Sequence, residues 1–280
     1  MKRVLLTALC ALYLLTAAPG FSALAEKAAT PTYTSGDFTY IILESGAAQI
    51  VDWEGDAAEL SIPASLDGYR VTSISECAFY GNQTLKSVVM PGSLREICEN
   101  AFEACVALER VTLNDGLLRI GDFAFQDCEG LLTISLPDSI EAIGENPFRG
   151  CANLYRISVS SRAENLVTLD GVLFSRSDRR LVCYPMGFQA LSYAVPAGTR
   201  QIGAWAFGGA LYLESLALPE SVSAIGSEAF NGCNGLRELS VPIRVTAVSA
   251  DATSGVTLRL EGGARVLKCV FPAGIAVNAA

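Results

Sequence analysis

A motif with a 23-residue period constrains the fold of this 280-residue chain more than any other feature of its sequence. Alanine–phenylalanine pairs and columns of isoleucine and leucine keep this step. The phenylalanines that mark it are Phe79, Phe102, Phe125 and Phe148 and, further along, Phe207 and Phe230. A fixed step of about 20–29 residues is typical of solenoids, in which no coil buries its own apolar side chains and neighbouring coils share one core. The sequence therefore predicts stacked coils with the phenylalanines inside.

Each repeat contains two kinds of segment. The segment L-x-x-V-x-L-P alternates between apolar and polar residues at its end, which predicts a short strand that the proline terminates. The segment I-G-x-x-A-F-x-x-C predicts a return side that is a tight helical turn or a second short strand. The expected fold is mostly β with short helical turns, a right-handed leucine-rich-repeat solenoid of 23-residue coils closed by β caps.

The repeat also divides the chain into segments. The spacing from Phe148 to Phe207 is longer than two repeats, so the chain carries an insertion between them. The turn signals Asp170-Gly171 and Ser177-Asp178 flank a short strand pattern in this gap. We therefore expect a solenoid over 70–242 with an irregular, hairpin-bearing coil at about 160–201. Residues 26–69 are expected to form an N-terminal β cap and 243–280 a C-terminal cap or tail.

Residues 1–25 have the organisation of a secretory signal peptide. Lys2 and Arg3 precede an apolar run over 4–18, and Ala23-Leu24-Ala25 is a small-x-small cleavage site. The apolar run is shorter than the roughly 20 residues of a membrane-spanning helix. We expect cleavage after Ala25 and a mature protein that is secreted or held at the cell surface without insertion into the membrane.

Charge and composition exclude several classes of function. The formal net charge is −9, or −11 once Lys2 and Arg3 are removed, and an acidic protein disfavours binding to nucleic acid. The sequence has no histidine, which excludes imidazole-based catalytic triads and histidine-ligated metal sites. We expect no catalytic residue, no cofactor and no metal. A hydrolase that uses a pair of carboxylates stays a remote alternative.

The repeat I-G-x-x-A-F-x-x-C-x-x-L-x-x-I-x-L-P resembles the BspA-like leucine-rich repeats of exported bacterial surface proteins. The inserted segment DGVLFSRSDRRLVCYP and the leading segment that starts GDFTYIILESGAAQIVDW are also similar to units of that family. The resemblance covers about residues 36–242. It implies an exported protein with a role in adhesion or contact with host surfaces, and it leaves the ligand unidentified.

A column of cysteines follows the phenylalanines. Cys105, Cys128, Cys151 and Cys233 each lie three places after the phenylalanine of their coil. Neighbouring rungs of a β-solenoid are ~4.8 Å apart, within the Cα separation of a disulfide, but side chains stacked in register point in parallel. We therefore expect buried free thiols, with disulfide bridges as the alternative.

The outward positions of the repeated strand are the candidate binding surface. Leu132 and Tyr155 are apolar residues at these positions, and Arg110 and Arg156 accompany them. Solenoids bind through such extended faces, and aromatic residues and arginine are enriched in interface hot spots. The alternative is an ordinary solvated sheet on which two apolar side chains are exposed.

The expected function is that of an exported, non-catalytic protein that binds an extracellular protein or glycan, as in adhesion. We expect it to act as a monomer. The alternative is a structural spacer or self-assembling element, which would associate through its ends or its edge strands.

Overall fold

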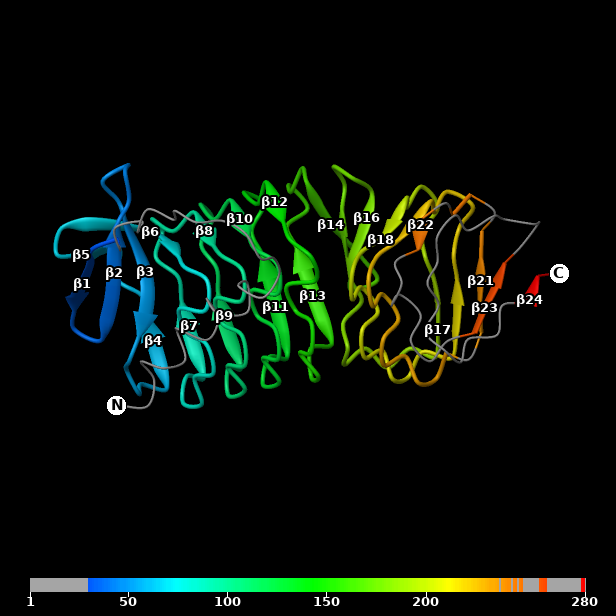
Figure 1. Cartoon of the computed structure of the whole chain (residues 1–280), viewed down its shortest axis with the longest axis horizontal. Helices are drawn as coiled ribbons and strands as arrows, with labels where there is room; N and C mark the ends of the chain where they lie inside the picture. Colours follow the sequence, from blue (N-terminus) through cyan, green and yellow to red (C-terminus); the bar gives the residue numbers. More distant parts are fainter. Residues whose placement is uncertain are drawn as a thin grey trace, which may run out of the picture.

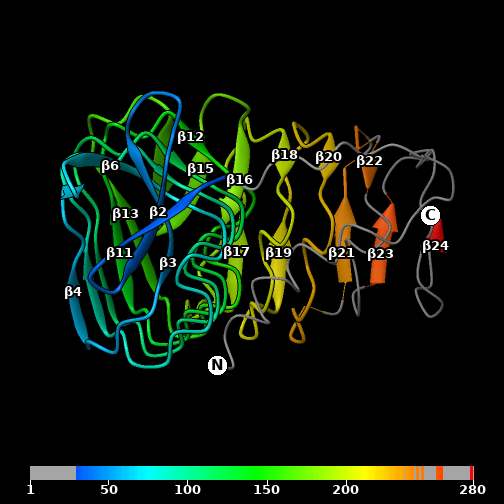
Figure 2. The same ribbon diagram turned by 60° about the vertical axis from the view of Figure 1, so that its left-hand side comes forward.

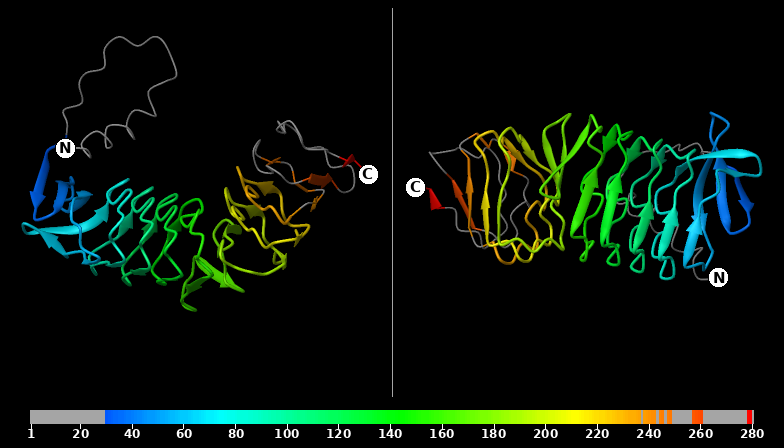
Figure 3. Two further views of the ribbon diagram at one scale, coloured as in Figure 1. Left: turned by 90° about the horizontal axis from the view of Figure 1, so that it is seen from below. Right: turned by 180° about the vertical axis from the view of Figure 1, so that it is seen from behind.

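The computed structural model describes residues 30–236, 238–242, 244–245, 247–248, 257–260 and 278–279. They form an elongated, bowed body of strands and turns, with the first and last described strands at opposite ends (Figures 1 and 3). Over these residues there is no helix of the length and apolarity needed to cross a membrane. The expected signal peptide, residues 1–25, lies outside the described residues.

Each regular coil contributes one strand to an outward face. Within each of these short sheets the strands are parallel, and between the regular coils paired residues are one repeat apart: Arg110 lies opposite Ser87, and Arg156 lies opposite Thr133. The solenoid of 23-residue coils is therefore confirmed. The face strands are β4 (Glu59–Ser61), β7 (Ser87–Val89), β9 (Arg110–Thr112), β11 (Thr133–Leu136), β13 (Arg156–Val159), β17 (Ser192–Ala194), β19 (Ser215–Ala217), β21 (Glu238–Val241), β23 (Thr257–Leu260) and β24 (Asn278–Ala279).

A second row of short strands lies on the other side of the core, so that a coil passes once through each row (Figure 2). In the first half this row consists of β6 (Tyr69–Ile74), β8 (Glu96–Ile97), β10 (Arg119–Ile120) and β12 (Ala142–Ile143). In the second half it consists of β16 (Arg180–Cys183), β18 (Gln201–Ile202), β20 (Ala224–Ile225) and β22 (Ala247–Val248). These are the second short strands that the repeat allowed for the return side.

Tight turns follow the second strand in each coil. The N–H of Cys105 donates to the carbonyl of Phe102 at 3.2 Å, and the N–H of Leu108 donates to the carbonyl of Cys105 at 3.0 Å. Such bonds between residues three apart close single turns of 3₁₀ type. The short helical turns expected from the sequence are thus single turns, and none of them continues into a helix within the described residues.

The phenylalanine column forms the spine of the core. Ring centroids are 4.6 Å apart from Phe79 to Phe102, 5.2 Å from Phe102 to Phe125 and 5.8 Å from Phe125 to Phe148, with nearly parallel planes. All four rings are almost completely buried. The shared core predicted from the repeat is therefore confirmed in the first half of the solenoid.

The cysteine column is buried and unbridged, which confirms the expectation of free thiols. Each Sγ donates to the carbonyl of the phenylalanine one coil back, as in Cys105 to Phe79 at 3.1 Å and Cys128 to Phe102 at 3.2 Å. Hydrogen bonds to the neighbouring thiols and burial raise the pKa of Cys128 well above its ordinary value. The thiol of Cys128 therefore stays protonated, and the hydrogen bonds of the column satisfy carbonyl groups inside the core.

Antiparallel strands cover the N-terminal end of the solenoid. β1 (Thr32–Ser35), β2 (Phe38–Ile42) and β3 (Ala48–Trp53) pair in sequence, β3 continues into the second row through β6, and β5 (Ser65–Leu66) pairs with β6. The buried ring of Trp53 lies 5.6 Å from Phe79, the first ring of the spine. These strands shield the open end of the core from water. Of the segment expected to form the C-terminal cap or tail, 243–280, only short pieces lie among the described residues.

The inserted residues form the expected hairpin-bearing coil. β14 (Leu166–Leu169), β15 (Val172–Ser175) and β16 pair antiparallel in sequence. Arg180 of β16 is nearly buried and ties the hairpin to the preceding coil: its Nη2 donates to the carbonyl of Ile143 at 2.9 Å, and its Nη1 lies 3.1 Å from the Glu145 carboxylate. These contacts hold the two halves of the solenoid together across the insertion.

Candidate functional site

The outward face is interrupted where the insertion enters. β13 pairs with β11 and the next face strand, β17, pairs with β19, but β13 and β17 do not pair and, unlike β9 and β11, do not pack side by side. The chain returns to the face along residues 185–191. There the N–H of Gly187 donates to the carbonyl of Leu154 at 2.8 Å, so the returning segment touches the previous coil at this point instead of pairing along it.

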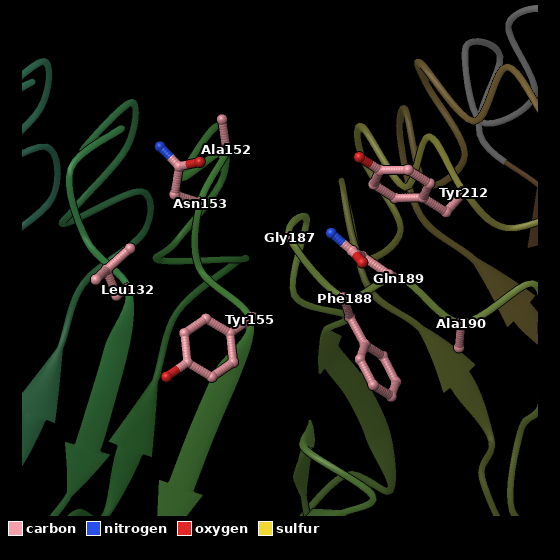
Figure 4. A pocket seen from close by; sticks show the side chains of 9 residues that line it. All are labelled: Leu132, Ala152, Asn153, Tyr155, Gly187, Phe188, Gln189, Ala190 and Tyr212. Atoms are coloured by element: carbon pink, nitrogen blue, oxygen red, sulfur yellow. The ribbon is translucent and has the colours of Figure 1, made fainter.

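A hollow of about 800 Å³ opens at this interruption (Figure 4). Leu132 and Tyr155, just before β11 and β13, line one wall, and Phe188, Gln189 and Tyr212 line the opposite wall. The lining is completed by Ala152, Asn153, Gly187 and Ala190. Because three of these four residues have small side chains or none, the space between the walls stays open.

Both walls present apolar surface to solvent. The exposed fraction is 49% for Leu132, 52% for Tyr155 and 47% for Tyr212, which is large for side chains of this kind. Apolar residues gathered around a concave surface are typical of binding sites, whereas single exposed apolar residues are ordinary. Leu132 and Tyr155, the two apolar residues named from the sequence, therefore lie around one hollow together with further apolar side chains.

The wall that carries Phe188 rests on the aromatic core of the second half. The ring of Phe188 lies 5.4 Å from that of Tyr184, which lies 5.2 Å from Phe207. Burial raises the pKa of Tyr184 to about 12, so this support stays uncharged. A ring that packs against a rigid core is held in place before a ligand arrives, which lowers the entropy cost of binding.

Of the four residues named from the sequence, the structure brings two to the hollow. Leu132 and Tyr155 line it, whereas Arg110 and Arg156 are exposed on the face but do not. The Nη2 of Arg110 lies 3.7 Å from the Glu59 carboxylate, an exposed pair of little energetic weight. Arg156 opens β13 in register with Thr133.

The other seven lining residues were not predicted from the sequence, and the largest of them are Phe188, Gln189 and Tyr212. A signal for Phe188 and Gln189 was present in the sequence, because Tyr184 stands one repeat before Phe207 and occupies the phenylalanine position of the irregular coil. Its N–H donates to the carbonyl of Ala206 in the next coil, as the N–H of Phe207 does to Ala229. Counting back from Phe207 therefore places 185–191 at the approach to the face.

The residues that line the hollow are aromatic, aliphatic, amide-bearing or small. Their side chains include aromatic rings and two amides, without a carboxylate, a thiol or a basic group.

A row of acidic residues follows the repeat but does not line the hollow: Glu76, Glu99, Asp122 and Glu145. Burial, followed by the charges of Asp122 and Glu76, raises the pKa of Glu99. Within the described part of the chain, no group of three or more acidic or cysteine side chains is arranged to hold a metal ion.

One protein-family model matches most of the chain. The family is described as the BspA type leucine rich repeat region, and six copies match over residues 59–179 and 187–259. No curated protein sequence matches the chain.

Solved structures of similar fold come from several bacteria. A leucine rich cell surface protein from Faecalibacterium prausnitzii is 21% identical with a TM-score of 0.54, covering 82% of this chain and 88% of its own. A leucine-rich repeat protein from Eubacterium ventriosum is 19% identical with a TM-score of 0.61, covering 82% and 71%. The pneumococcal vaccine antigen PcpA is 21% identical with a TM-score of 0.52, covering 82% of both chains. At these identities the likeness is one of fold.

Proposed function

Because the chain belongs to the BspA-type leucine-rich repeat family, we propose that it is an exported, non-catalytic protein that binds an extracellular protein or glycan in the medium or at the bacterial surface. The signal-peptide pattern of residues 1–25 supports export. Two proteins of similar fold are named as a cell surface protein and a vaccine antigen, which supports a surface location.

The observation that carries this proposal is the hollow at the interruption of the face. Leu132 and Tyr155 expose about half of their surface there and face Phe188 and Tyr212 across the gap (Figure 4). Between regular coils such as those of β9 and β11 the next face strand packs beside the last, and here it does not. The absence of acidic and basic groups from the lining supports a binding role over a hydrolytic one, which needs a general acid or base at the reacting bond.

The test is a binding screen with two matched variants. Purified protein is offered to immobilised extracellular-matrix proteins, mucins and a glycan array. The variant that combines Leu132→Ser with Tyr155→Ala changes the candidate surface, and the control Lys86→Ala with Glu109→Ala changes exposed positions of the same repeat column on earlier coils. We expect the first variant to lose the wild-type signals and the control to keep them. Equal signals for wild type and the first variant would refute the proposed surface.

Self-association separates this proposal from the structural-spacer alternative. A binding protein of this kind is expected to be monomeric, so light scattering coupled to gel filtration should give the mass of one chain at micromolar concentration. A concentration-dependent rise to dimers or longer assemblies would favour the spacer. Mass spectrometry of the secreted protein should find Glu26 at the N-terminus, as expected from cleavage after Ala25.

A further inference from the structure

We propose that the hollow between Tyr155 and Phe188 binds a neutral oligosaccharide. The inference rests on the proposed binding function and specifies its ligand. It is carried by the aromatic walls, the amide groups and the absence of charge in the lining of the hollow.

The size of the hollow suits a short sugar chain. Its volume of about 800 Å³ falls within the range of about 300–1,000 Å³ that is usual for small-molecule sites. Ala152, Gly187 and Ala190 leave this volume unfilled. Because the hollow is open to solvent, a chain of several sugar residues can enter without a rearrangement of the coils.

The walls match the apolar side of a sugar ring. A pyranose has faces of C–H bonds that pack on the electron-rich face of an aromatic ring, and its hydroxyl groups point outward around the rim. Tyr155 supplies a ring on one side of the gap, and Phe188 and Tyr212 supply rings on the other (Figure 4). Phe188 is fixed against Tyr184 at 5.4 Å, so part of the stacking surface is formed before binding.

The polar groups match the hydroxyl rim. The amide of Gln189 and the hydroxyl of Tyr212 both point into the gap from the second wall (Figure 4). The Nδ2 of Asn153 donates to the carbonyl of Glu129 at 2.8 Å, which fixes the orientation of that amide. An amide offers both a donor and an acceptor, as a sugar hydroxyl does, so each amide can exchange hydrogen bonds with the rim.

The charge of the lining selects a neutral ligand. None of the lining residues carries a carboxylate, an ammonium or a guanidinium group. A sulfated or uronate-containing chain would therefore lose its hydration without gaining a cationic partner, and the net charge, −11 without Lys2 and Arg3, would repel it. A basic peptide would lose hydration of its cationic groups in the hollow, and the lining has no carboxylate to pair with them. A flat protein partner is less well matched, since the aromatic rings stand on the two sides of a hollow and not on a raised patch.

The test uses arrays and titrations with defined sugars. Neutral probes are β-glucan, mannan, galactan and chito-oligosaccharides, and anionic probes are heparin and polygalacturonate. We expect binding to at least one neutral class and none to the anionic ones. In calorimetric titration of the bound sugar, Tyr155→Ala should weaken affinity by about tenfold or more, as loss of an aromatic anchor does.

A second variant guards against loss of binding through misfolding. Ala152→Trp adds bulk to the lining at an exposed position and removes no contact of the core, so it should abolish sugar binding while the thermal unfolding temperature stays unchanged. The control Tyr33→Ala removes an exposed tyrosine from the N-terminal cap and should bind as wild type does.

Several results would overturn the inference. They are binding restricted to anionic glycans, neutral binding that survives both Tyr155→Ala and Ala152→Trp, and the absence of any neutral glycan signal. If a protein ligand is bound instead and Tyr155→Ala weakens it, the oligosaccharide inference fails while the proposed binding function stands. If neither proteins nor glycans depend on this face, both fail.

Discussion

Truncation of Phe125 to alanine should destabilise the solenoid severely. Phe125 has no exposed surface and its ring stacks on both neighbours of the spine, at 5.2 Å from Phe102 and 5.8 Å from Phe148. Removing a buried phenylalanine side chain costs about 3–5 kcal/mol, because the transfer free energy is lost and a cavity remains. The two stacked pairs place this site in the upper part of that range, since each adds about 0.5–1.5 kcal/mol beyond area burial.

The assay is urea unfolding followed by far-ultraviolet circular dichroism and tryptophan fluorescence. Phe125→Leu keeps most of the volume and should cost about 1.5 kcal/mol or less. Tyr155→Ala, at a side chain that is 52% exposed, should change the free energy of unfolding by about 0.5 kcal/mol or less. If Phe125→Ala cost no more than Tyr155→Ala, the stacked spine would not be the source of stability and the reasoning would be refuted.

Three further predictions address the turns, the interruption and the thiols. Ala104 has a φ of 57°, and Gly81 fills the equivalent place of the previous coil. Ala104→Gly should therefore relieve left-handed backbone strain and raise the free energy of unfolding by about 0.5–1 kcal/mol in urea titrations. A decrease in that free energy would contradict this prediction. Gly187→Ala places a Cβ about 2.9 Å from the carbonyl oxygen of Leu154, which is closer than ordinary van der Waals contact. The substitution should therefore lower both the thermal unfolding temperature and the affinity for the ligand. Unchanged affinity would contradict the hollow as the binding site. Burial raises the pKa of Cys98 from 9.0 to about 11, so the protonated thiol favours the folded state. Its contribution to the free energy of unfolding is constant below about pH 9 and is lost as the pH rises from 9 to 11. Cys98→Ser should therefore flatten that fall in unfolding curves measured as a function of pH.

The regular coils could be predicted because their information is local and repeated. A residue such as Phe102 has the same neighbours in each coil, so its burial and its stacking on Phe125 follow from the repeat step alone. The same reasoning found the buried free thiol of Cys128, since a side chain in a repeated column points along its neighbours and not toward them.

The hollow could be predicted only in part because it depends on where the repeat fails. Leu132 and Tyr155 were found from their outward register, but the insertion hid the coil that faces them. The contacts across the insertion have no periodic signal: Arg149 lies over the ring of Trp205, at 3.5 Å from its centroid, although the two residues are far apart in the chain. Such contacts depend on the path of the inserted hairpin, which the spacing of the repeat does not determine.

Hydrogen–deuterium exchange with and without the strongest ligand from the binding screen tests the central claim most directly, because it locates the contact surface on the wild-type chain. If the hollow at the interrupted face is the binding site, backbone amides at 151–156 and 186–192 should exchange more slowly in the complex, and those of the return turns at 98–104 and 121–127 should not change. Protection confined to the return turns, with residues 151–156 and 186–192 unaffected, would contradict the account.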